Sequence, residues 1–131
     1  MKRVFLDANV LFSAAWREEN GLLKLWRLAG VELVTSDYAA REAELNLPDE
    51  PRRQRLHHLL RRVTVLPHPD APPPLPSGVQ LPPKDIPILQ AAICAQALVL
   101  LTGDVTHFGA YFRKRLGGVL VLPPAEFLTA H

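Results

Sequence analysis

Four acidic side chains stand where the expected strands and helices begin or end: Asp7, Glu42, Asp85 and Asp104. Carboxylates that are crowded together repel one another, and their charged forms are disfavoured unless a cation is near. Hard oxygen ligands of this kind suit Mg²⁺ or Mn²⁺. One or two such ions activate water for attack on a phosphodiester and stabilise the leaving oxygen. If the four carboxylates meet, the chemistry that they indicate is metal-dependent hydrolysis of a phosphodiester.

Short runs rich in leucine or β-branched residues predict five strands, at residues 4–6, 31–34, 63–66, 97–101 and 119–122. Several of these runs are apolar on both faces, as buried parallel strands are. Apolar residues with helical spacing lie between them, at residues 22–29, 56–63 and 88–95. Strands that alternate with helices predict an α/β fold with a mostly parallel sheet. A chain of 131 residues suits one core, so we expect residues 1–131 to form a single domain.

The order of the expected elements brings the acids to one edge of the sheet. Asp7 directly follows the first strand, and Asp104 follows the fourth. In an open parallel sheet, ligands bind beyond the carboxyl ends of the strands, where the strand order reverses. Asp85 opens the helix before the fourth strand, and Glu42 lies early in the helix after the second. Since crossover helices run antiparallel to their strands, all four acids converge if the first and fourth strands are neighbours.

Each acid also has an ordinary structural explanation. Asp7 and Asp85 suit the caps of the helices that follow them. Asp104 comes after Gly103 and suits a turn, and Glu42 suits a solvated position on its helix. Only the convergence of all four at one edge favours the metal site over these explanations.

The residues around the acids resemble those of the PIN-domain family of nucleases, and in particular the toxin ribonucleases of bacterial VapBC toxin–antitoxin pairs. The similar segments are VFLDANVL at 4–11, SDYAARE at 36–42, KDIPILQAA at 84–92 and VLLTGD at 99–104. The resemblance implies a three-layer α/β/α sandwich with a mostly parallel sheet of about five strands. It also implies RNA as substrate, and an acidic pocket in which Asp7, Glu42, Asp85 and Asp104 bind Mg²⁺ or Mn²⁺. Members often form homodimers and are blocked by a small antitoxin.

Three further residues enter through the resemblance. Asn9 and Thr102 match positions that support the acids by hydrogen bonds. His107 stands where many relatives carry a further acid. An imidazole ligates softer ions than Mg²⁺, and the alternatives are that His107 donates to a phosphate or simply docks its loop. A second departure is a long proline-rich connection at 67–83, which we expect to run extended on the surface.

A short basic amphipathic helix is expected at residues 51–62, with Arg52, Arg55 and Arg62 roughly on one face. These arginines are candidates for RNA binding through phosphates. The alternative is a solvated helix face. The net charge of +2 and the pI near 9.0 tolerate a phosphate-bearing partner without requiring one.

The single cysteine, Cys94, excludes an intramolecular disulfide and is expected to be a small core residue. We find neither a signal-peptide pattern nor an apolar run of membrane-spanning length, so we expect a cytoplasmic protein without membrane contact. Two other functions stay open. One is a haloacid-dehalogenase-like phosphatase, although Asn9 stands where that class needs a second aspartate. The other is a catalytically inactive RNA- or protein-binding module on the same fold.

Overall fold

A computed structural model describes residues 1–131 and contains one six-stranded sheet. The strands are β1 (Lys2–Leu6), β2 (Val31–Ser36), β3 (Thr64–Leu66), β4 (Val99–Leu101), β5 (Arg115–Leu116) and β6 (Val119–Leu122). Their order is β3-β2-β1-β4-β6-β5, and every pairing is parallel except that of β5 with β6. The predicted mostly parallel sheet is therefore confirmed.

The strand that the sequence analysis missed is β5. It has only two residues and joins β6 through Gly117 and Gly118, both of which have positive φ angles. A two-residue hairpin loop of this kind matches the twist of its strands and is best made by glycine. The Gly-Gly pair just before the 119–122 run was the signal for it.

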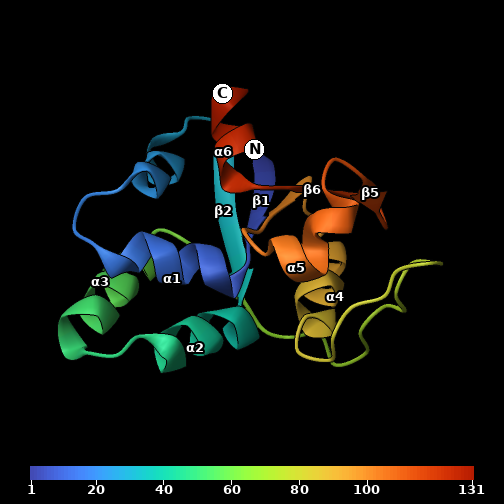
Figure 1. Ribbon diagram of the computed structural model, residues 1–131, viewed down its shortest axis with the longest axis horizontal. Helices are drawn as coiled ribbons and strands as arrows, with labels where there is room; N and C mark the ends of the chain where they lie inside the picture. Colours follow the sequence, from blue (N-terminus) through green and yellow to red (C-terminus); the bar gives the residue numbers. More distant parts are fainter.

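Helices cover both faces of the sheet. They are α1 (Ala8–Trp16), α2 (Asp37–Asn46), α3 (Glu50–Leu60), α4 (Ile86–Cys94), α5 (Val105–Phe108) and α6 (Pro124–Thr129), with 3₁₀ helices η1 (Gly21–Arg27) and η2 (Gly109–Tyr111). In Figure 1, α1, α2 and α3 lie on one side of β1 and β2, and α4 and α5 lie on the other. This is the three-layer arrangement that was predicted. The helix expected at 22–29 is the shorter 3₁₀ helix η1.

The central strands form the core because helices shield them on both sides. Phe5 and Leu6 in β1 and Leu100 and Leu101 in β4 are each 0% exposed. Burying a side chain of this size contributes roughly 1.5–3 kcal/mol. At the sheet edge, by contrast, β3 leaves Val65 41% exposed.

The strand order reverses between β1 and β4. These strands are neighbours, with Leu6 opposite Leu101, although β2 and β3 come between them in the chain. The Asp7 backbone N–H donates to the Leu101 carbonyl at 3.0 Å and extends the pairing by one residue. The carboxyl ends of β1 and β4 therefore open onto one crevice.

The proline-rich residues 67–83 contain neither helix nor strand and extend away from the body beside α4 (Figure 1). Side chains from the body hold the segment. Gln90 donates to the Pro73 carbonyl at 2.9 Å, and the Tyr111 hydroxyl accepts from the Gln80 N–H at 2.8 Å.

Cys94 corrects one expectation. It is exposed at the end of α4 and is not a core residue. Its apolar neighbours Ala91, Ala92 and Ala95 occupy the buried face of that helix instead. No helix in the structure has both the length and the apolar character needed to cross a membrane.

Candidate functional site

The structure brings all four predicted acids into one pocket at the carboxyl edge of the sheet. The pocket has a volume of about 420 Å³, and Asp7, Glu42, Asp85 and Asp104 all line it. They come from the end of β1, from α2, from the start of α4 and from the loop after β4. Lys84, also in the lining, is the one cation there.

Asp7 lies deepest in the pocket and is only 4% exposed. Its carboxylate accepts hydrogen bonds from the Thr102 hydroxyl at 2.8 Å and from the Ala8 N–H at 2.6 Å. The pKa of Asp7 is raised from 3.8 to about 6, chiefly because the carboxylate is buried. The two hydrogen bonds oppose this rise, and the nearby charges of Asp85 and Glu42 add to it.

Asn9 and Thr102 tie the end of β1 to the end of β4. The Asn9 amide donates to Asp7 at 3.1 Å and to the Thr102 hydroxyl at 3.2 Å, while its carbonyl accepts from the Gly103 N–H at 3.0 Å. The Thr102 hydroxyl also accepts from the Asp104 N–H at 3.2 Å. This network holds Asp7 and the backbone of Asp104 in one arrangement.

Asp85 does not act as a helix cap. It precedes α4, but its side chain makes no capping hydrogen bond. The residue is 6% exposed, and burial raises its pKa, with Lys84 and His107 opposing the rise and Asp104 adding to it. Its Oδ2 atom is buried without a hydrogen-bond partner. The capping explanation is therefore wrong for this residue.

Asp104 both caps a helix and lines the pocket. Its Oδ1 accepts from the His107 N–H at 3.0 Å and so caps the one-turn helix α5. Its Oδ2 accepts from Nδ1 of the His107 ring at 2.8 Å. The same Nδ1 lies 3.0 Å from Asp85 Oδ2, but its N–H points to Asp104, which explains why Asp85 Oδ2 still lacks a hydrogen bond.

Glu42 reaches the pocket from the second turn of α2. The Ser36 hydroxyl accepts from the Ala39 N–H at 3.1 Å and starts this helix directly at the end of β2. Glu42 is half-buried and thus is not simply a solvated residue. Asn46, one turn further along, also lines the pocket and was missed in the sequence, although its i+4 spacing from Glu42 places it on the same face.

The candidate RNA-binding arginines lie outside this pocket. Arg52 donates to the Trp16 carbonyl at 3.1 Å and stacks over the Trp16 ring at 3.9 Å. Arg55 donates to the carbonyls of Ala15 and Trp16, each at 2.9 Å. Both guanidinium groups thus satisfy carbonyls that the end of α1 leaves free. Arg62 follows α3 and is exposed.

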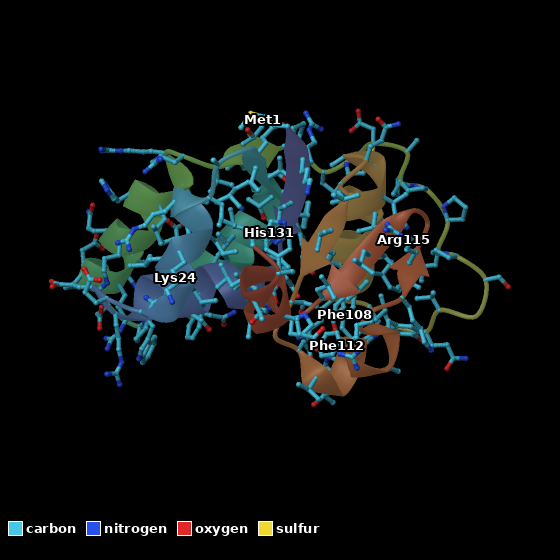
Figure 2. The ribbon with its side chains drawn as sticks, turned by 90° about the horizontal axis from the view of Figure 1, so that it is seen from above. Met1, Lys24, Phe108, Phe112, Arg115 and His131 are labelled. Atoms are coloured by element: carbon cyan, nitrogen blue, oxygen red, sulfur yellow. The ribbon has the colours of Figure 1, made fainter.

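A larger groove, of about 850 Å³, adjoins the acidic pocket, and Phe12 lines both. It runs between α1, η1 and α6. Figure 2 shows α6, which is followed by His131, near Lys24 of η1. The charged residues in its lining, Arg17 and Lys24, are both cations. The molecule therefore places a cationic groove directly beside a cluster of carboxylates.

The fold has counterparts among solved structures. A chain in the structure of VapBC2 from Rickettsia felis bound to a DNA fragment from their promoter matches with a TM-score of 0.69 at 13% identity, over 92% of this chain and 98% of that chain. The present protein therefore has a PIN-like fold. VapBC-1 from nontypeable Haemophilus influenzae matches with a TM-score of 0.59 at 17% identity, over 94% and 98% of the two chains. FitAcB from Neisseria gonorrhoeae matches with a TM-score of 0.56 at 21% identity, over 93% and 98%.

At these identities the likeness concerns the fold, and for the fold it confirms the PIN resemblance drawn from the motifs. No protein-family model matches the sequence, and no curated protein matches it. The PIN-like fold therefore rests on structure, while the chemistry rests on the pocket.

The donor set of the pocket fits a hard divalent ion. It offers carboxylate oxygens from four chain segments, among them a buried Asp85 Oδ2 that accepts no hydrogen bond. Carboxylates are the ligands that Mg²⁺ and Mn²⁺ prefer. A divalent ion also offsets the desolvation of the buried Asp7 and Asp85 carboxylates and the repulsion from neighbouring acids.

Proposed function

We propose that this protein is a metal-dependent ribonuclease that hydrolyses phosphodiester bonds in RNA and uses Mg²⁺ or Mn²⁺. One observation carries the proposal: two buried carboxylates with raised pKa values, Asp7 and Asp85, share a pocket with two further acids at the reversal point of the sheet. Such an arrangement is costly without a cation and becomes useful with one.

Each residue has a defined part in this proposal. Asp7 and Asp104 are the central ligands, and Asp85 and Glu42 complete the site. When bound, the ion lowers the pKa of water and neutralises charge on the phosphate. Thr102 acts as a positioning residue because its hydroxyl donates to Asp7 and accepts from the Asp104 N–H. Asn9 has the same role through its amide.

The cationic groove supports a nucleic-acid substrate. Arg17 and Lys24 offer two charges for phosphates, and Phe12 offers an aromatic ring on which a base of a single strand stacks. Phe12 lines both the groove and the acidic pocket, so a nucleic-acid strand in the groove continues past the carboxylates. We therefore propose that single-stranded RNA lies along this groove.

The test is cleavage of a mixed pool of single-stranded RNA in Mg²⁺, in Mn²⁺ and in chelator. We expect cleavage by the wild type with either ion, none in chelator, and loss in Asp104→Asn. Asparagine also caps helices well, so α5 is retained in this variant. The matched control is Asp70→Asn, an exposed acid in the proline-rich segment, which retains activity. A folded wild type that cuts no RNA with either ion contradicts the proposal.

A small antitoxin is the partner that we propose. The similar structures are named as pairs, VapBC and FitAcB, and the sequence resembles the toxin ribonucleases of VapBC pairs. We expect a small open reading frame beside the gene whose product, purified together with this chain, suppresses cleavage. Cleavage that is unchanged at a molar excess of that product argues for a stand-alone processing nuclease.

The phosphatase alternative is less well supported by the local geometry. That chemistry needs an acid two residues after the nucleophile, and the Asn9 amide at this position already donates to Asp7 and Thr102. A covalent phosphoaspartate trapped at Asp7 would restore the alternative. If the protein is instead an inactive binding module, we expect it to bind RNA without cutting it.

A further inference from the structure

His107 lies between two of the carboxylates that the proposed nuclease uses. Its Nδ1 is 2.8 Å from Asp104 Oδ2 and 3.0 Å from Asp85 Oδ2. One ligand atom from each of the three residues can be chosen so that all lie within 4.8 Å of one another. Two carboxylates and one imidazole thus face a single point, although the three residues come from the start of α4, the loop after β4, and α5.

Of the two carboxylates close to His107 Nδ1, only that of Asp104 forms a hydrogen bond with it. The single Nδ1–H is directed at Asp104, and Asp85 Oδ2 is buried without a partner. A buried acceptor that receives no hydrogen bond destabilises the fold. A cation held by all three side chains satisfies every one of these atoms, whereas a single proton on the ring does not.

The backbone holds His107 in this position. Its N–H donates to Asp104 Oδ1 at 3.0 Å, and the next residue, Phe108, is fully buried and anchors α5 to the core (Figure 2). The His107 side chain is 32% exposed, so an ion reaches the group from solvent. A ring that only docked its loop would not require a second carboxylate within 3.0 Å.

We propose that His107 is a ligand of the divalent ion and turns the preference of the site towards first-row transition ions such as Mn²⁺ and away from Mg²⁺. Mg²⁺ favours oxygen ligands and keeps its waters. An imidazole nitrogen is bound more strongly by transition ions, which accept mixed oxygen and nitrogen donors. The inference rests on the proposed function, because the ion is the one that the nuclease employs.

The test compares ion binding by calorimetry, with Mn²⁺ and with Mg²⁺, for wild type, His107→Gln and His107→Asp. The control is His58→Gln, an exposed histidine on α3. We expect His107→Gln to lower the Mn²⁺-to-Mg²⁺ affinity ratio by roughly tenfold or more, the scale seen when a metal site loses a supporting group. His107→Asp raises Mg²⁺ affinity relative to Mn²⁺, and the control changes neither.

Direct ligation has its own spectroscopic signature. In the Co²⁺-loaded protein, a coordinated imidazole gives a strongly shifted N–H proton signal that exchanges in D₂O. We expect one such signal in the wild type and in His58→Gln, and none in His107→Gln. An unchanged affinity ratio without this signal overturns the inference, while metal-dependent RNA cleavage that persists in His107→Gln leaves the nuclease itself intact. Failure of the wild type to bind either ion refutes both.

Discussion

The Thr102 hydroxyl donates to Asp7 Oδ2 at 2.8 Å although 95 positions separate the two residues. Both residues are buried, and the same hydroxyl accepts from the Asn9 amide and the Asp104 N–H. One oxygen atom thus joins the carboxyl ends of β1 and β4. This contact helps to fix the positions of both central acids.

Thr102→Val keeps the side-chain shape but leaves the hydrogen-bonding groups around it unpaired. We expect the free energy of unfolding to fall by about 2 kcal/mol. We also expect cleavage to fall by roughly 10- to 100-fold, because Asp7 and Asp104 lose their support. Urea unfolding and RNA cleavage measure the two effects. The control is Thr64→Val, an exposed threonine in the edge strand β3 and outside both the pocket and the groove, which leaves cleavage unchanged and the free energy of unfolding within about 0.5 kcal/mol; full activity in Thr102→Val contradicts the positioning role.

The stability of the protein in chelator is expected to decrease as pH rises from about 4 to about 6. Asp7 has a pKa of about 6 in the folded state against 3.8 as its ordinary value, so the folded state binds the proton more tightly in this window. Ionisation then disfavours folding by up to roughly 3 kcal/mol at 1.36 kcal/mol per pH unit. Above pH 6 this contribution is constant.

Asp7→Asn removes this dependence, since the amide does not ionise. Urea unfolding at a series of pH values, in chelator, should give a variant more stable than wild type at pH 7 and similar to it near pH 4. Parallel curves for the two proteins argue against a raised pKa at Asp7. In the wild type, divalent ions compete with the proton at Asp7, so cleavage should decline below about pH 6.

Arg55 is expected to serve stability and not RNA binding. Arg55→Met removes charge-assisted donors from the Ala15 and Trp16 carbonyls at the end of α1, and we expect a loss of roughly 1–2 kcal/mol. RNA affinity below the unfolding temperature should be unchanged, as in the exposed Arg62→Met. A drop in RNA affinity for both variants with a shallower salt dependence supports the phosphate-binding surface predicted from the sequence.

Removal of the two groove cations should weaken RNA binding without affecting stability. In Arg17→Ala/Lys24→Ala, the slope of log affinity against log salt should become shallower by roughly 1.4, which corresponds to two single-strand phosphate contacts. Both residues are exposed. The matched control removes two exposed cations outside the groove, Lys2 and Arg27. Equal slopes for all three proteins exclude the groove as the path of the strand.

Local patterns in the chain were sufficient for the five parallel strands and their order, but not for β5 or for the 3₁₀ form of η1, and they marked the four acids that line the pocket. Apolar runs bounded by polar residues mark β1, β2 and β4 because helices cover both of their faces, and this pattern is readable without knowing any contact. Asp7 and Asp104 were identifiable because each directly follows such a run. Cys94 was misjudged for the same reason: an apolar run is not buried all round when its helix has one solvent face.

The tertiary structure alone decided which groups meet. That β1 pairs with β4 across two intervening strands is a non-local choice, made by the packing of the whole sheet. It brings Thr102 to Asp7, a contact that only the family resemblance had implied, and the fold brings His107 to Asp85, a contact for which the sequence holds no spacing rule. In the sequence, Arg55 likewise resembles a free surface charge, and only the packing of α3 against α1 brings it to the Ala15 and Trp16 carbonyls. A sequence therefore determines which side chains stand at the ends of its elements, while their partners depend on long-range burial that no local pattern encodes.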